Sequence, residues 1–576
     1  MLSCDEFPSI DTTHNHHVFF QEELVFFYFY NYRPSSLEET TSLSIRFDHV
    51  LRTLKQSLYK DVFGSQEYLI LFFRLLGYTR SIQHGKGEHD LSYLMLCSWY
   101  KQFPILAIYA LHRFVVCTYA QETPFGSWRD MKYLCQFINT YTVQKQDHAL
   151  IDVCCDMMNN QLEKDLATQN IHALPKNIHS ISNVAKWIPR EHKKVDWLYD
   201  KLVIHWTKQH KPHILRTATG ASYWSALNKC KRLYRKKIAS LNKMIDTTQI
   251  KQCARLRHTI IPSHVSQFTQ MKQPNLVFGH GDNDKKDRLL CSQNFRNWFD
   301  EKHIPSSGGP STINSLPINS YIKRAVQLLA NVDQINQDTI EYEKHILNKQ
   351  WSVLSRTFHK NHIGHTIPIV DVSDSMCQTT LDHYYTAIGH AILLAQNSLF
   401  TNRILAVHDT PTWINLENKQ GLVSAVEHIQ HCLRNASCIY ANFNSAFLLI
   451  GKTIRNSSLT NREIRNMCLV LFSTGSTLSS TPLMYDTIVS QFNDFCFHMP
   501  FIVFWNVSNE VGDKFPCSIH QHSAIMISGS SSSLFAILLD KFKYLHTTPY
   551  KTICNLLRHP RYDVLENYVL RNIVPR

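Results

Sequence analysis

The stretch IPIVDVSDSMCQTT, residues 367–380, decides how the second half of the chain folds. Its first part is apolar and rich in β-branched residues, which is typical of a buried strand. Oxygen-bearing side chains then follow at Asp371, Ser373, Asp374 and Ser375. In a sheet of parallel strands, ligands bind beyond the carboxyl ends of the strands. The stretch therefore predicts a strand that ends in a candidate site, either a working metal site or the remnant of one.

Residues 365–545 alternate between short β-rich runs and helical patterns. The strand-like runs are IPIVDVS, RILAVHD, MCLVLFSTG, FIVFWNVS and SAIMISG. Longer segments with helical spacing, such as TLDHYYTAIGHAILLAQN, lie between them. Strand–helix–strand units repeated in this way predict a doubly wound parallel sheet with helices on both faces.

Residues 40–350 show a different pattern, with apolar side chains at spacings of three and four, as in LRTLKQSLYKDVFGSQEYLILFFRLLGYTR (51–80). This spacing predicts an all-helical, repeat-like module of packed helix pairs. Residues 1–39 then form an N-terminal extension, and residues 546–576 form a C-terminal helical tail. The predicted fold class is α + α/β.

The composition indicates an ordinary globular protein of two or three domains, with 576 residues of which 44% are hydrophobic. Its 16 cysteines form no C-x-x-C pair, which argues against zinc ribbons and a disulfide framework and favours a reducing compartment. No stretch reaches the roughly 18 apolar residues that a membrane span needs, and residues 1–30 do not resemble a signal peptide. We therefore expect a cytoplasmic protein without membrane contact.

A basic segment runs from Lys186 to Arg257, where 18 Lys or Arg stand against 4 Asp or Glu in a chain of net charge +14. Aromatic residues are interleaved with these charges at Trp187, Trp197, Tyr199, Trp206, Tyr223, Trp224 and Tyr234. Cations suit phosphate contacts, and aromatic faces suit stacking on unpaired bases. The candidate nucleic-acid contacts are Lys229, Lys231, Arg232, Arg235, Lys236, Lys237 and Lys243. The alternative is a solvated helix face whose aromatic residues belong to the core.

Several motifs resemble known families. The D-x-S-x-S pattern at 371–375 resembles the first part of the metal-ion-dependent adhesion site of a von Willebrand factor A domain. RSIQHGKGEHD (80–90) and PFGSWRDMKYL (124–134) resemble segments of Ro-type RNA-binding proteins, which join a helical TROVE module to an A domain. The chain resembles even more an uncharacterised family of plants and large DNA viruses with the same layout, over roughly residues 60–575. Two further stretches carry that likeness, the basic YRKKIASLNKMIDTTQIKQCARLRHTIIPS (234–263) and FHMPFIVFWNVS.

These resemblances imply a von Willebrand A-like sheet domain after a helical, HEAT-like or TROVE-like module. They also imply a ribonucleoprotein-type function, with protein contacts through the A domain. In a virus-encoded protein, the location is the host cytoplasm or the virion.

The A-domain resemblance implies that Mg²⁺ is bound by Asp371, Ser373 and Ser375, together with a Thr and a second Asp from later loops. Where those two residues are expected, this sequence has Ala441 and Asn442, and then Thr474. Mg²⁺ prefers about six oxygen ligands, and one carboxylate with hydroxyls is a weak set unless Asp374 or Asp409 completes it. We therefore expect a degenerate site, and the alternative is a structural turn between strand and helix.

No nucleophile, base and oxyanion donor come together in any motif, so we expect a protein that is not an enzyme. We expect it to bind RNA through the basic segment and a protein partner through the A-like domain. The alternative function is a protein–protein scaffold without nucleic-acid binding. In HGKGEH (84–89), Lys86 and the nearby Arg80 can reach phosphates, but a tight turn between helices is favoured.

Overall fold

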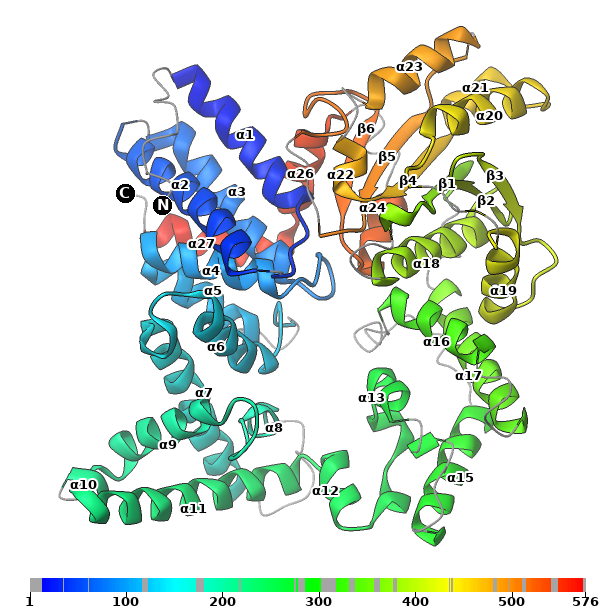
Figure 1. Cartoon of the computed structure of the whole chain (residues 1–576). Helices are drawn as coiled ribbons and strands as arrows, with labels where there is room; N and C mark the ends of the chain where they lie inside the picture. The colour runs from blue at the N-terminus through cyan, green and yellow to red at the C-terminus, as the bar shows by residue number, and fades with distance from the viewer. Residues whose placement is uncertain are drawn as a thin grey trace. The chain divides into compact units, whose positions relative to one another are not determined.

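The structure is a computed structural model of the whole chain (Figure 1). It describes residues 13–34, 36–60, 62–116, 123–171, 181–216, 219–273, 276–277, 285–301, 317–330, 337–356, 363–376, 381–434, 436, 439–479, 484–495, 497–509, 514–539 and 547–572. The chain forms two compact units. The first contains residues 1–33, 52–91 and 304–576, and the second contains residues 34–51 and 92–303.

A six-stranded sheet lies in the first unit, with the strand order β3-β2-β1-β4-β5-β6. Its strands are β1 (Thr366–Asp371), β2 (Arg403–Val407), β3 (Thr412–Asn415), β4 (Cys468–Ser473), β5 (Phe501–Asn506) and β6 (Ala524–Ser528). Strands β1, β4, β5 and β6 are buried along their whole length. Helices cover both faces of such a sheet, which is why these strands read as continuous apolar runs. All five predicted strands are therefore confirmed.

The sheet was predicted to be parallel, and the structure shows a mixed sheet that departs from this at one edge. β3 pairs antiparallel with β2, whereas every other neighbouring pair is parallel. Only Ile414 of its four residues is buried, so the strand carries almost no hydrophobic signal. The sheet is mixed because the chain turns straight back after β2 instead of crossing over through a helix.

Helices pack on both sides of the sheet, and Figure 1 shows α18 on one side and α20, α21 and α23 on the other. The helices that accompany the sheet are α16 (Ile318–Ala330), α17 (Gln337–Arg356), α18 (Leu381–Asn397), α19 (Leu422–Cys432), α20 (Phe443–Arg455), α21 (Asn461–Arg465), α22 (Gly475–Ser479), α23 (Met484–Asp494) and α24 (Phe535–Leu539). α18 contacts β1, and α16 packs on α18. A Cβ at Gly389 would lie 2.2 Å from Cγ2 of Ile318, so glycine permits this close helix approach.

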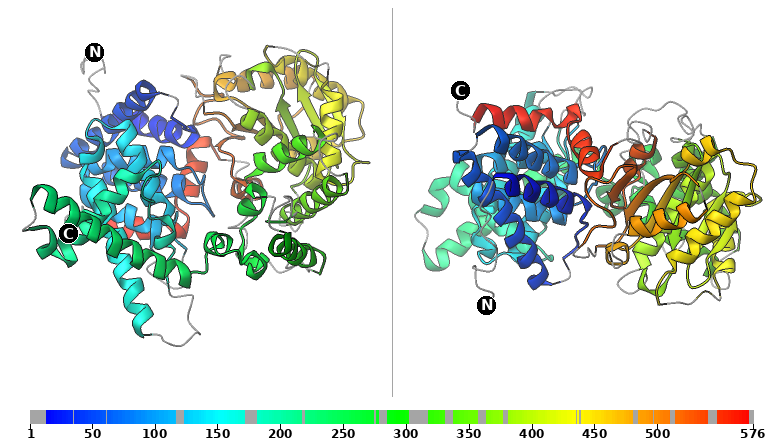
Figure 2. Two further views of the ribbon diagram at one scale, coloured as in Figure 1. Left: turned by 60° about the horizontal axis from the view of Figure 1, so that its bottom comes forward. Right: turned by 90° about the horizontal axis from the view of Figure 1, so that it is seen from above.

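Segments from both ends of the sequence belong to the unit that contains the sheet. They form α1 (Thr13–Phe29), α3 (Val62–Arg80), α26 (Pro549–Leu557) and α27 (Asp563–Asn572). α1 and α26 both contact β6, and α27 contacts α3 (Figure 2). The residues predicted as an N-terminal extension and as a C-terminal tail thus belong largely to the unit that contains the sheet.

The second unit is helical throughout its described residues, as predicted for this part of the chain. Its helices are α5 (Pro104–Val115), α6 (Arg129–Tyr141), α7 (Ala149–Ile171), α8 (Val184–Trp187), α9 (Asp196–His210), α10 (Pro212–Arg216), α11 (Gly220–Met244), α12 (Thr248–Cys253), α13 (Gln267–Lys272) and α15 (Lys285–Glu301). Two more helices, α2 (Leu37–Lys60) and α4 (Asp90–Gln102), have residues assigned to each of the two units. Successive helices pair, α6 with α7, α7 with α9, and α9 with α11. None of the helices described is both long and apolar enough to cross a bilayer.

Candidate functional site

Asp371 ends β1 at the point where the strand order reverses. The chain passes from β1 to β2 on one side and later to β4 on the other side. Open α/β sheets bind ligands at this kind of topological switch point, beyond the carboxyl ends of the strands. The predicted candidate site therefore lies where this class of sheet places one.

The Asp371 carboxylate is fully buried and already accepts three hydrogen bonds. Oδ1 accepts from the backbone N–H of Ser373 at 3.0 Å and from its hydroxyl at 2.6 Å. Oδ2 accepts from the Ser473 hydroxyl at 2.5 Å. Burial raises the pKa of Asp371, and these hydrogen bonds act in the opposite direction. Hydrogen bonds from Ser373 and Ser473 thus fix the position of the Asp371 side chain.

Ser473 is the residue that the sequence analysis missed. It is the last residue of β4, and the pairing of Val370 with Phe472 brings it beside Asp371. The resemblance directed attention to the next residue, Thr474, whose hydroxyl instead accepts the backbone N–H of Thr477 at 3.1 Å. The alternation of side chains along β4 could have identified Ser473, because it places this residue on the opposite side of the strand from Phe472.

The predicted metal ligands come together, but the set is poor in charge. The Ser375 hydroxyl lies 2.7 Å from that of Ser373, which itself donates to Asp371. Asn442 caps α20, its side chain accepting the Ser445 N–H at 3.0 Å, and Asp374 and Asp409 are exposed. Across the described residues, no three His, Cys, Asp or Glu side chains gather around one point. One buried carboxylate with neighbouring hydroxyls does not fit a resident Mg²⁺.

The two motifs near the N-terminus have structural roles. Asp130 of PFGSWRDMKYL is buried and accepts hydrogen bonds from the Tyr93 hydroxyl at 2.6 Å and the Ser127 N–H at 2.7 Å. Lys86 of HGKGEH is only 3% exposed and donates to the carbonyls of Tyr28, at 2.9 Å, and Tyr30. A lysine buried in this way does not contact phosphates, so the favoured interpretation of a tight turn accounts for this motif.

The seven predicted nucleic-acid contacts all lie on α11, which contains no Asp or Glu in its 25 residues. Three of them are paired with acidic residues of neighbouring helices and loops. Lys231 lies 2.6 Å from Asp200, Arg235 lies 3.4 Å from Glu191, and Lys237 lies 2.6 Å from Glu163. Burial opposes ionisation of Glu163, but hydrogen bonds from Lys237 and Trp206 hold its pKa below the ordinary value. These three cations help to hold α11 in place.

The other four cations, Lys229, Arg232, Lys236 and Lys243, are exposed and make no ion pair with any described residue. At about 100° per residue they fall within an arc of roughly 60° on the helix surface. The buried Leu227, Cys230, Tyr234 and Leu241 lie on the opposite side. We call these four cations the α11 stripe.

The aromatic residues of the basic segment likewise include buried and exposed members. Tyr199, Trp206 and Tyr234 are buried and pack together with ring centroids 5.9 Å and 5.7 Å apart, as the core alternative predicts. Trp224 is 64% exposed, and among the residues that the structure describes no other tryptophan is an exposed large hydrophobic side chain. It lies one and a half turns before Lys229 on the same helix. One aromatic face is therefore available for stacking beside the stripe.

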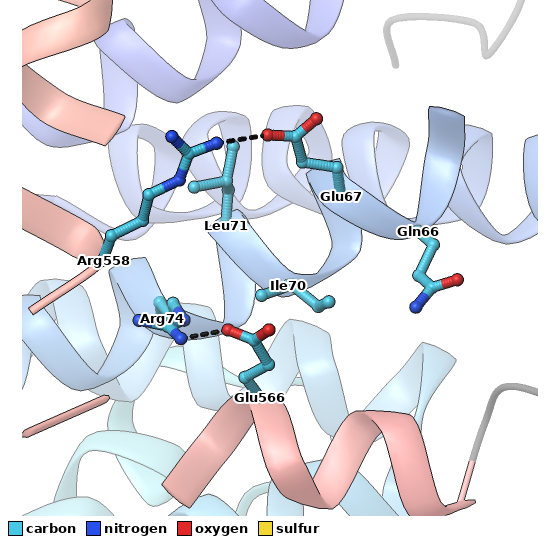
Figure 3. Close-up of a pocket in the computed structure, with 7 residues that line it drawn as sticks. All are labelled: Gln66, Glu67, Ile70, Leu71, Arg74, Arg558 and Glu566. Atoms are coloured by element: carbon cyan, nitrogen blue, oxygen red, sulfur yellow. Dashed lines mark hydrogen bonds and ion pairs between the residues drawn. The ribbon is translucent and has the colours of Figure 1, made fainter. Parts of the chain in front are cut away.

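A pocket of about 310 Å³ lies on α3, between it and the C-terminal helices (Figure 3). Its charged groups form ion pairs with one another or with the neighbouring Asp563. Arg74, almost fully buried, pairs with Glu566 and lies 2.8 Å from Asp563, and Arg558 lies 2.7 Å from Glu67. Arg74 also donates to the carbonyl of Leu557 at 2.9 Å. The pocket therefore marks the joint that holds α26 and α27 on α3.

Comparison with known protein families finds a similarity over the sheet domain. Residues 365–552 match a family described as a domain of unknown function, DUF7788. The match covers the six strands and helices α18 to α24 but not α16 or α17, which is less than half of the chain, and it adds no activity or ligand. Among curated proteins, none matches this sequence.

Proposed function

We propose that this protein binds RNA without catalysing a reaction, and that the exposed face of α11 is its contact surface. The observation that carries the proposal is the α11 stripe, four exposed cations on a helix without acidic residues. Solvated helix faces usually mix the two signs of charge, because like charges three or four residues apart repel one another. A stripe of one sign is stabilised when it neutralises a polyanion.

The charge distribution supports the same proposal. The excess of basic residues between Lys186 and Arg257 equals the net charge of the whole chain, +14. Phosphates bound there would release counterions, so affinity falls steeply as salt rises. Trp224 provides a stacking face for an unpaired base, a contact that recurs in the recognition of single-stranded RNA. We therefore expect single-stranded regions to bind more tightly than duplex.

In this proposal the sheet domain is von Willebrand A-like and contacts a protein partner. Its strand order and the Asp371 loop at the switch point support the resemblance. Ile439 and Tyr440, 62% and 74% exposed, lie next to Asn442, whose N–H donates to the His408 carbonyl just beyond β2. Exposed aliphatic and aromatic groups beside strand ends favour a protein contact. A scaffold that binds only protein through this edge is the alternative.

The test is fluorescence anisotropy of a labelled single-stranded RNA and a matched hairpin, across a series of salt concentrations. The variant Lys229→Glu/Lys236→Glu/Lys243→Glu reverses the charge of three of the four stripe cations and leaves Arg232 in place. The control Lys419→Glu/Lys452→Glu/Lys551→Glu changes the net charge equally at exposed lysines of the first unit. Each lost phosphate contact removes about 0.7 from the logarithmic salt slope, or about fivefold in affinity at 0.1 M salt. We expect the stripe variant to bind roughly 100-fold more weakly.

The control variant is expected to keep most of its affinity, and Trp224→Ala to lose binding to the single strand more than to the hairpin. Equal losses in the stripe and control variants would mean that net charge alone attracts RNA. No salt-dependent binding by the native chain would eliminate the proposal and leave the scaffold function.

A further inference from the structure

The segment between α1 and α2 crosses the carboxyl ends of β5 and β6. Residues 28–32 are buried, although residues 30–33 have no regular secondary structure. Asn31 donates through Nδ2 to the carbonyls of Asn506, at 3.1 Å, and Ser508, at 3.0 Å. In return, Asn506 donates to the Phe29 carbonyl at 3.3 Å and Ser528 donates to the Tyr28 carbonyl at 2.8 Å. We call residues 28–33 the strap.

Lys86 holds the strap from the other side. Its ammonium group donates to the carbonyls of Tyr28 and Tyr30, and the Glu88 carboxylate accepts the Tyr32 N–H at 3.3 Å. The turn that carries Lys86 is itself tied to the end of the sheet, since Ser533 donates to the Gly85 carbonyl at 2.8 Å. The strap is therefore bound along its backbone from two sides, much as a peptide ligand would be.

Ser508 connects the strap to the Asp371 site. Its carbonyl accepts from Asn31, and its hydroxyl accepts the backbone N–H of Gly475 at 3.1 Å. Gly475 begins α22, two residues after Ser473, which donates to the Asp371 carboxylate. The backbone N–H of Val507 also donates to the Ser473 carbonyl at 3.1 Å. A short chain of buried contacts thus links the strap to the candidate site.

We propose that the strap is an intramolecular ligand of the sheet, which fills the β5–β6 end of the binding edge and fixes the loop after β4. Side chains at the carboxyl ends of parallel strands usually face a ligand. Here Asn506, Ser508 and Ser528 are all buried and hydrogen-bonded to the strap or to its neighbours. The carboxyl end of the sheet is therefore closed at β5 and β6. The conformation of the loop beside Asp371 depends on whether the strap is bound there.

The unmatched Asn31 oxygen lowers the cost of releasing this ligand. Oδ1 of Asn31 is buried and accepts no hydrogen bond from the described residues. Water would satisfy this atom once the strap lifts, which offsets part of the loss of the Nδ2 contacts. A partner that engages residues 28–33 would then open the β5–β6 end and loosen the loop after β4 together.

Hydrogen exchange measured by mass spectrometry on the full chain tests this proposal. Asn31→Ala removes the two hydrogen bonds that the Asn31 side chain donates to the Asn506 and Ser508 carbonyls. The matched control Asn397→Ala removes a local bond of a buried asparagine in α18, 2.8 Å to the Leu393 carbonyl. Two lost hydrogen bonds of ordinary strength change an opening equilibrium roughly 10-fold or more. We expect exchange about 10-fold faster in peptides covering 28–34, 505–509 and 473–478, with the interiors of β1 and β4 unchanged. The control is expected to leave all three peptides as in the native chain.

Normal exchange at 505–509 and 473–478 in a folded Asn31→Ala variant would overturn the proposal. An equal rise over the whole first unit would overturn it too, because Asn31 would then be a general stability residue. Should Asn31→Ala not fold, Ser528→Ala provides the same test by removing a single strap contact. Faster exchange confined to the strap and the two linked segments is the supporting outcome in either variant.

Discussion

His390 provides a sharp test of how the sheet core is built. It lies in α18, is completely buried, and packs among Phe472, Trp505 and Phe535 with ring centroids 5.9, 4.6 and 5.1 Å away. Neither ring nitrogen has a hydrogen-bond partner among the described residues. Burial lowers its pKa from 6.5 to about 3, so the folded protein holds a neutral imidazole.

The perturbation is His390→Leu, which keeps the volume and removes the titrating group. Because the folded pKa is the lower one, the unfolded chain takes up a proton as pH falls below 6.5, and the folded chain does not until about pH 3. Stability is therefore unaffected above pH 6.5 and is lost as pH falls toward 3. pH 5 lies 1.5 units below the pKa of 6.5 in the unfolded chain. At 1.36 kcal/mol per unit, the titration of His390 therefore makes the free energy of unfolding of the native chain about 2 kcal/mol lower at pH 5 than at neutral pH.

The assay is urea unfolding of the native chain and the variant between pH 5 and pH 7.5. At pH 7.5 we expect His390→Leu to be about as stable or somewhat more stable, because unpaired buried nitrogens are removed while ring stacking is lost. At pH 5 we expect an additional advantage of about 2 kcal/mol for the variant. Parallel pH dependences in the two proteins would refute the reasoning, since His390 would then titrate alike in the folded and unfolded chains.

Three further predictions follow from the described contacts. Replacing Arg74 with Met removes the hydrogen-bond donor of Asp563, Glu566 and the Leu557 carbonyl. We expect this variant to destabilise the first unit by about 2 kcal/mol and to make α26 and α27 sensitive to protease. Added Mg²⁺ is expected to leave the Tm of both the native chain and Asp371→Ala unchanged, and a rise in the native chain alone would establish a metal site. Lys237→Ala is expected to lower the free energy of unfolding by about 1 kcal/mol, because it removes the ion pair with Glu163 and the contact with the Trp206 ring, and to change RNA affinity little. Lys236→Ala is expected to weaken RNA binding and to change the free energy of unfolding little. Urea unfolding and anisotropy on the same two samples decide this last pair.

The comparison of Lys236 and Lys237 shows what the sequence can and cannot predict about the candidate surface. Charge and aromatic content located the basic segment, because both are properties of composition. They do not separate adjacent lysines, since pairing depends on where Glu163 and Trp206 are brought by α7 and α9. A helical wheel from the buried Leu227, Tyr234 and Leu241 would have placed Lys236 outward and Lys237 toward the core. That signal was in the sequence and was not used.

The sheet was predictable for a physical reason, and its edge contacts were not. Strands covered on both faces are continuous apolar runs, so the five parallel strands were evident, while β3 with one buried residue was not. Tyr28 to Tyr32 fell within the predicted N-terminal extension because their partners, Asn506 and Ser528, lie more than 470 residues away. Sequence spacing carries no information on such a pairing. In the proposal made above, these long-range hydrogen bonds close the carboxyl ends of β5 and β6 and leave the end of β1 open. The properties of the Asp371 site then depend on residues 28–33, which sequence patterns place in an N-terminal extension.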